Sequence, residues 1–264
     1  MSDRVTVAID DGVADVRLNR PDKLNALDQA MFEALVDTGR RLSGERGVRA
    51  VLLSGAGRAF CAGLDFGSFM AMAGGERPRR SLMDRSEDSP ANFAQQAAFV
   101  WKTLPVPVIA AVHGVAFGGG LQIALGADIR LVAPDAQLSV MEVKWGLIPD
   151  MSGTQTMRHL VRLDVAKELT FTGRIVSGSE AVQLGLATRT SETPLESAHA
   201  LAREIAGKSP DAIRAGKRLL DQAWQVSTAE GLRLEEEMQV SLMGSPNQVE
   251  AVQANMEKRA PKFR

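Results

Sequence analysis

The sequence predicts an α/β fold that ends in a helical region. Three observations support this prediction: strand-like and helix-like segments alternate over residues 5–54, a buried strand at 108–112 leads to a glycine-rich helix start, and helical spacing dominates after residue 150. A chain of 264 residues is long enough to form one core with a helical appendage and to enclose a pocket.

The first elements are a hairpin, a helix and a buried strand. Apolar residues alternate over 5–9, Asp11-Gly12 is a typical hairpin turn, and residues 13–18 begin the second strand. Helical spacing between Asp28, the expected N-cap, and Gly44 predicts a helix. The apolar run at 49–54 then predicts a buried strand that ends in a tight loop.

The middle of the chain contains a polar segment and a second group of α/β elements. Residues 67–90 carry too few apolar side chains to pack as a core element, so we interpret them as a mobile surface insertion. After this segment we expect a helix at 91–104, strands at 108–112, 129–133 and 138–141, and a helix at 118–125.

Residues after 150 show mainly helical spacing. The predicted helices are 153–163, 164–171, 179–185, 194–208, 210–226 and 228–242.

Composition excludes several classes of function. The formal charge is -1, so no overall positive field attracts nucleic acid. The single cysteine, Cys61, cannot form an internal disulfide, and no Cys/His cluster has zinc spacing, so we expect no structural metal. The N-terminus does not resemble a signal peptide and no apolar run is long enough to span a bilayer, so we expect a cytoplasmic protein without a membrane segment.

Two small-residue segments are candidate ligand sites. The loop at 60–65 follows a buried strand, and its small residues leave backbone N–H groups open to a ligand. Gly118-Gly119-Gly120 opens a helix, where exposed N–H donors and the helix dipole would stabilise an anion. Both segments can also be explained by tight turns or close helix packing.

An ordered series of segments resembles the crotonase (enoyl-CoA hydratase/isomerase) superfamily. These segments are Arg20 to Leu27, the loop 60–65, IAAVHGVAFGGG at 109–120, ADIR at 127–130, GLIP at 146–149, GTQ at 153–155, LTFTG at 169–173 and 181–186. The resemblance implies a crotonase-type spiral of ββα units over 1–195 and a helical region over 196–264 that makes trimer contacts. A homotrimer or a hexamer is therefore expected.

The resemblance also implies an acyl-CoA substrate and no separate cofactor. The oxyanion-hole donors would be the N–H groups of Leu64 and Gly119, which together stabilise a thioester enolate. The residues implied in binding coenzyme A are Lys23, Ala26, Leu27, Ala62, Gly63, Asp65, Phe263 and Arg264.

Three side chains bear on the choice of reaction. Family hydratases carry two glutamates; the second matches Glu142, but Gln122 occupies the place of the first. Glu142 alone could move a proton from carbon 2 to carbon 4, so we expect double-bond isomerisation. Asp150 matches an aspartate of dienoyl-CoA isomerases, although it could instead cap a helix that starts near Ser152. Hydration despite Gln122, and a non-catalytic acyl-CoA binding protein, remain alternatives.

Overall fold

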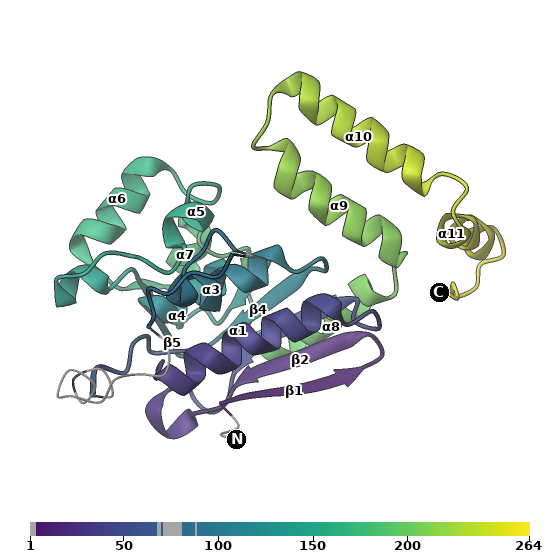
Figure 1. Ribbon diagram of the computed structural model, residues 1–264. Coiled ribbons are helices and arrows are strands. Elements are labelled where there is room, and N and C mark those ends of the chain that lie inside the picture. Colours follow the sequence, from purple (N-terminus) through teal and green to yellow (C-terminus); the bar gives the residue numbers. More distant parts are fainter. Residues whose placement is uncertain (1–3, 68–69, 71–80, 88) are drawn as a thin grey trace.

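The computed structural model describes residues 4–67, 70, 81–87 and 89–264, and it contains two sheets enclosed by helices (Figure 1). The larger sheet has the order β1 (Val5–Asp10), β2 (Val13–Leu18), β3 (Ala50–Gly55), β4 (Val108–Val112), β6 (Ile129–Val132) and β9 (Arg189–Thr190). The smaller sheet has the order β5 (Val115–Phe117), β7 (Gln137–Ser139) and β8 (Val176–Ser177). The predicted α/β class is confirmed.

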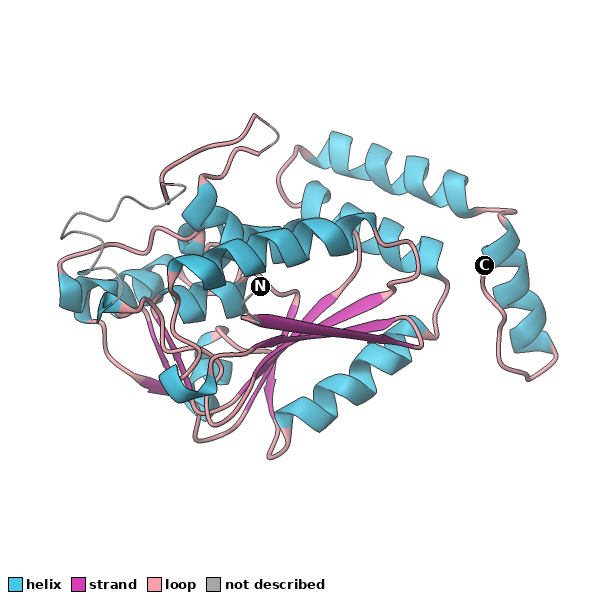
Figure 2. Ribbon diagram, turned by 60° about the horizontal axis from the view of Figure 1, so that its bottom comes forward, coloured by secondary structure: helices cyan, strands magenta, loops and turns pink. Residues whose placement is uncertain are grey.

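Helices cover both faces of the larger sheet (Figure 2). The helices of the described residues are α1 (Gln29–Gly44), α3 (Phe93–Thr103), α4 (Gly119–Leu125), α5 (Gly153–Met157), α6 (Leu163–Thr172), α7 (Gly178–Leu184), α8 (Pro194–Ala206), α9 (Pro210–Ala223), α10 (Thr228–Leu242) and α11 (Pro246–Met256). α1 and α8 lie on the larger sheet. The described residues also form the short 3₁₀ helices η1 (Pro21–Lys23) and η2 (Glu142–Trp145).

The central strands are parallel and buried on both sides. β1 pairs with β2 as the predicted antiparallel hairpin, whereas β2, β3, β4 and β6 pair in parallel. In β3, Val51 and Leu53 face the core beneath α1 and α3, while Ala50 and Leu52 face α8. Because both faces are covered, the strand is a continuous apolar run rather than an alternating one.

Two helix starts have the capping that their sequences favour. The side chain of Asp28 accepts a hydrogen bond from the N–H of Met31 at 2.9 Å, as predicted for the N-cap of α1. Asn92 and Gln95 form a reciprocal capping box at the start of α3. Local hydrogen bonds therefore set where these helices begin.

The three helices α9, α10 and α11 extend away from the sheet, in green to yellow in Figure 1. Lys217 anchors α9 to the α/β part of the chain, because its Nζ lies 2.6 Å from Oδ2 of Asp128 and 3.1 Å from the carbonyl oxygen of Val106. The boundary between core and helical region at 195/196 stays a prediction, and α8, which begins at Pro194, packs on the sheet.

Several elements differ from the sequence predictions. The helix predicted at 153–163 is only Gly153–Met157, and Leu160 and Val161 beyond it leave the helix and pack against the core. The strand β5 and the helix α11 were not predicted; α11 is marked by Ser245 as N-cap and Pro246 as its first residue. Most of the insertion predicted at 67–90 lies outside the described residues.

Candidate active site

A mainly apolar cavity of about 200 Å³ lies where the loop after β3, the start of α4, η2 and the turn at 147–151 meet. Its lining residues include Gly63, Leu64, Gly119, Glu142 and Asp150. With Leu27 and Ala62, seven of the residues selected from the sequence therefore gather at one cavity. Leu82 and Met83, from the described end of the insertion, also line it.

The loop at 60–65 lies directly beside β5. The N–H of Phe117 donates to the carbonyl oxygen of Cys61 at 3.0 Å, and Cys61 N–H donates to Val115 at 3.0 Å. Gly63 has φ +87°, and a Cβ built on it would lie 2.6 Å from the carbonyl oxygen of Phe117 and 3.8 Å from the nitrogen of Gly119. Glycine is required here because the two segments approach so closely.

The backbone N–H groups of Leu64 and Gly119 donate no hydrogen bond within the part of the chain that the structure describes. Leu64 is flanked by bonds to Leu27: Leu27 N–H donates to Gly63 at 2.8 Å, and Asp65 N–H donates to Leu27 at 3.0 Å. Gly119 is the first residue of α4, where an N–H has no partner in the helix. Two residues with unused N–H donors thus line the cavity.

The carboxyl group of Glu142 is buried at the same cavity. Oε1 accepts a hydrogen bond from Nε2 of Gln122 at 2.6 Å, while Oε2 has no partner in the described chain. Burial raises the pKa of Glu142, and the nearby Asp150 adds to this effect, whereas hydrogen bonds from the backbone and from Gln122 oppose it. A carboxyl group in this environment can exchange a proton at a higher pH than an exposed one.

Gln122 lies on α4 and is buried. Its Oε1 accepts two backbone hydrogen bonds, from Met151 N–H at 2.8 Å and from Gly153 N–H at 2.9 Å. These bonds connect α4 to the turn before α5 and point the amide nitrogen of Gln122 toward Glu142.

Asp150 borders the cavity from the turn before α5; the residue is exposed overall, and partial desolvation raises the pKa of its carboxyl group. The alternative interpretation, in which Asp150 caps the helix, is wrong. The N-cap of α5 is Ser152, which has φ 68° and makes no side-chain capping bond. Asp150 also lines a second, more polar cavity together with Arg85 and Arg158, so its carboxyl group lies between an apolar and a polar space.

The segments implied in coenzyme A binding are only partly at the cavity. Leu27 and Ala62 line it with Gly63. Lys23 ends η1, and Arg20 organises the neighbouring loop: its Nη1 donates to the carbonyl oxygen of Ala26 at 3.1 Å and to Oδ2 of Asp65 at 2.7 Å. Asp65 therefore serves at least as an ion-pair partner that holds the loop.

Phe263 and Arg264 lie away from this cavity in the same chain. Arg264 N–H donates to Oδ1 of Asn247 at 2.9 Å, and Arg49 donates to the carbonyl oxygen of Phe263 at 3.4 Å. Arg49 precedes β3, whereas the loop at 60–65 follows it. The tail is thus held at the other end of that strand, and the single chain does not bring it to the site.

Sequence reasoning missed the aromatic part of the cavity wall. The rings of Phe66 and Trp145 stack with centroids 4.0 Å apart and an interplanar angle of 30°. Phe66 directly follows the loop at 60–65 and Trp145 lies three residues after Glu142, so proximity in sequence to the selected residues was the available signal.

Cys61 is buried, and burial raises the pKa of its thiol to about 12.

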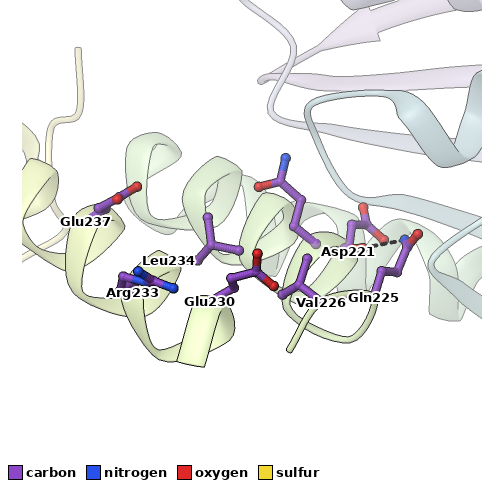
Figure 3. Close-up of a pocket in the computed structure, with 8 residues that line it drawn as sticks. Asp221, Gln225, Val226, Glu230, Arg233, Leu234 and Glu237 are labelled. Atoms are coloured by element: carbon purple, nitrogen blue, oxygen red, sulfur yellow. Dashed lines mark hydrogen bonds between the residues drawn. The ribbon is translucent and has the colours of Figure 1, made fainter. Parts of the chain in front are cut away.

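A larger cavity, of about 690 Å³, lies between α9 and α10 (Figure 3). Two of its charged side chains already have structural partners: Asp221 pairs with Lys102 at 3.0 Å, and Glu230 accepts from Ser227 at the start of α10. Within the described ranges, no group of three potential metal ligands occurs and no helix is long and apolar enough to cross a bilayer. The cavity beside Glu142 is therefore the better candidate site.

Comparison with known proteins identifies the family. The profile of the family described as enoyl-CoA hydratase/isomerase matches residues 8–264. The human enoyl-CoA hydratase domain-containing protein 2, mitochondrial, is 35% identical, and the match covers 98% of this chain and 88% of the human protein. The mouse Delta(3,5)-Delta(2,4)-dienoyl-CoA isomerase, mitochondrial, is 34% identical over 95% of this chain and 78% of the mouse protein.

The fold matches a solved structure equally well. The crystal structure of enoyl-CoA hydratase from Bacillus anthracis is 31% identical, with a TM-score of 0.87 and 98% of each chain covered. Fold and comparisons together define an enzyme of the crotonase type. The chain belongs to the enoyl-CoA hydratase/isomerase family.

Proposed function

We propose that this enzyme shifts a carbon–carbon double bond of an enoyl-CoA thioester, with Glu142 as the group that moves the proton. The observation that carries the proposal is the state of the Glu142 carboxyl group, which is buried, held at Oε1 by Gln122 and unpartnered at Oε2. One oxygen fixes the orientation, and the other has no hydrogen-bond partner in the described chain that competes for a substrate proton.

The reaction begins with the thioester carbonyl oxygen accepting hydrogen bonds from the N–H groups of Leu64 and Gly119. These donors stabilise the negative charge that develops on the oxygen when a proton leaves carbon 2. Glu142 takes that proton from a 3-enoyl thioester and a dienolate forms. Return of the proton to carbon 4 moves the double bond to carbon 2 and regenerates the carboxylate, with no net gain or loss of atoms.

Asp150 is the second proton-transfer group of the proposed site. It lines the cavity with Glu142, and burial raises the pKa of both carboxyl groups. With a conjugated 3,5-dienoyl thioester, the two carboxyl groups could serve carbons at opposite ends of the dienolate. The similarity to a dienoyl-CoA isomerase supports this assignment.

Hydration of a 2-enoyl thioester is the second candidate, supported by the names of the human and Bacillus anthracis proteins. That reaction benefits from two titrating groups beside the added water, and the amide of Gln122 cannot titrate. Glu142 and Asp150 remain the titrating groups that line the cavity in the described chain.

We further propose that the enzyme is a trimer or a hexamer in which a neighbouring subunit brings its tail to the coenzyme A. The distance of Phe263 and Arg264 from the cavity within one chain supports a contribution from outside that chain. Large apolar side chains on the protruding helices are exposed and available for subunit contacts: Leu220, Trp224, Leu232, Val240, Met243 and Met256.

The test is a comparison of 3-enoyl, 3,5-dienoyl and 2-enoyl thioesters with the wild type and with Glu142→Gln. Isomerisation predicts that the wild type converts 3-enoyl or dienoyl substrates and that the variant does not. A wild type that only hydrates 2-enoyl thioesters contradicts the proposal. Binding of acyl-CoA without turnover of any substrate would instead identify a non-catalytic binding protein.

A further inference from the structure

We propose that Gln122 is a positioning residue that holds the Glu142 carboxyl group for proton transfer and prevents the site from activating water. The inference rests on the proposed function, since it explains why this site would favour a double-bond shift over hydration. It concerns a residue whose side chain cannot itself carry the transferred proton.

The orientation of the Gln122 amide is fixed by its partners. Oε1 faces two backbone N–H donors, those of Met151 and Gly153, at 2.8 and 2.9 Å. If the amide were flipped, its NH₂ group would face the two backbone N–H donors and its oxygen would face the carboxylate of Glu142. All three hydrogen bonds would then be lost. The donor end must therefore point at Glu142.

Glycine residues make this close arrangement sterically possible. A Cβ at Gly153 would lie 2.7 Å from Oε1 of Gln122, which is inside ordinary contact distance. A Cβ at Gly118 would lie 3.3 Å from Oε1 of Glu142. A side chain at position 118 or 153 would therefore crowd the amide or the carboxyl group.

The hydrogen bond from Gln122 has two consequences for Glu142. It favours the ionised carboxylate, which opposes the effect of burial on the Glu142 pKa. It also occupies Oε1, so that Oε2 is the oxygen whose hydrogen-bonding capacity is not used within the described chain.

The same bonds leave Gln122 without an acceptor for water. A carbonyl-type oxygen has two lone-pair directions, and both are used by the backbone donors. A water molecule beside Gln122 could only receive a hydrogen bond from the amide, so it could not lose a proton to it. Replacing the amide by a carboxyl group would restore a titrating partner 2.6 Å from Glu142.

The first experiment measures the titration of Glu142 by ¹³C NMR of the labelled carboxyl group in the wild type and in Gln122→Met. We expect the variant, which lacks the donor, to titrate about one pH unit higher or more, because a hydrogen bond to a charged group is removed. Isomerase kcat/KM should show the same shift of its acidic limb. Equal titration in both proteins overturns the positioning role.

The second experiment measures 2-enoyl-CoA hydration by Gln122→Glu. An increase of at least tenfold over the wild type is expected, within the range for a general acid or base. An unchanged hydration rate in a folded Gln122→Glu protein overturns the effect on water. Gln155→Met is the matched control, because Gln155 is exposed and, among the described residues, its side chain bonds only to the neighbouring Thr154.

The NMR titration does not depend on which reaction the enzyme catalyses. If the wild type fails to isomerise any thioester, the proposed function fails. The positioning role is still supported if Glu142 titrates at a higher pH in Gln122→Met than in the wild type. If the wild type isomerises and Glu142 titrates identically in both proteins, the positioning role alone fails. Thermal unfolding of each variant verifies that the fold is retained.

Discussion

Nε2 of Gln122 lies 2.6 Å from Oε1 of Glu142, while Oε2 of the same carboxyl group has no partner in the described chain. A buried, half-satisfied carboxyl group costs folding free energy, and such groups occur where chemistry needs them. The arrangement therefore links the stability of this fold to its proposed activity.

Glu142→Gln should reduce isomerisation of 3-enoyl thioesters by roughly 10² to 10⁴, because the proton-transfer group is lost while the shape is kept. Steady-state kinetics measure the loss, and calorimetric binding of a saturated acyl-CoA tests whether the cavity remains. Loss of binding together with activity would indicate structural damage rather than loss of the proton carrier.

Glu142→Gln should also stabilise the protein, and more so as the pH rises. The folded state raises the Glu142 pKa above its ordinary value of 4.5, so the folded protein binds a proton more tightly than the unfolded chain. The associated stability is present at low pH and is lost as the pH rises through the raised pKa. Thermal unfolding at several pH values measures this, and a constant difference in Tm between the two proteins would contradict it.

The isomerase activity should increase as the pH rises, whereas the stability contributed by protonated Glu142 decreases. Only the carboxylate form of Glu142 can accept the proton from carbon 2, so kcat/KM should fall as the pH decreases through a pKa above 4.5. A pH–rate profile for a 3-enoyl thioester measures the acidic limb. A limb at or below 4.5 would exclude Glu142 as the group whose ionisation controls the rate.

Gly119→Ala should strongly reduce activity, by about 10² to 10³ if the Gly119 N–H is displaced from the thioester oxygen. The new Cβ would lie 2.6 Å from Sδ of Met151 and 3.0 Å from Cδ1 of Leu27, so either these side chains or the start of α4 must shift. Gly216→Ala is the control. Gly216 lies in the helix α9, and a Cβ added there would meet no described atom within 4 Å beyond its chain neighbours and the helix backbone. It should keep full activity and gain up to about 1 kcal/mol of stability.

Asp150→Asn should lower turnover of 3,5-dienoyl thioesters more than turnover of 3-enoyl thioesters. The longer dienolate must be protonated farther from Glu142, at the end assigned to Asp150. The ratio of the two kcat/KM values measures this preference. An equal decrease for both substrates would assign Asp150 a structural role only.

The sequence was a good guide wherever local physics decides the structure. The N-cap at Asp28, the buried run of β3 and the glycine triplet before α4 each correspond to what the structure shows. The resemblance placed Leu64, Gly119 and Glu142 together, and the structure brings them to one cavity.

The remaining features depend on contacts between distant segments. The periodicity of the sequence does not show that Oε1 of Gln122 accepts hydrogen bonds from Met151 and Gly153. It also does not show that Arg20 pairs with Asp65, 45 positions away. The stacking of Phe66 on Trp145 likewise requires the tertiary fold. Short elements such as β5 carry too few residues to show a pattern.

The most direct measurement follows a 3-enoyl thioester that carries deuterium at carbon 2, with NMR reporting how fast that label leaves the carbon. Removal of the label is predicted for the wild type and for Asp150→Asn, and none above background for Glu142→Gln. Removal at the wild-type rate in Glu142→Gln, or an intact label in a wild type that hydrates 2-enoyl thioesters, would contradict proton abstraction by Glu142.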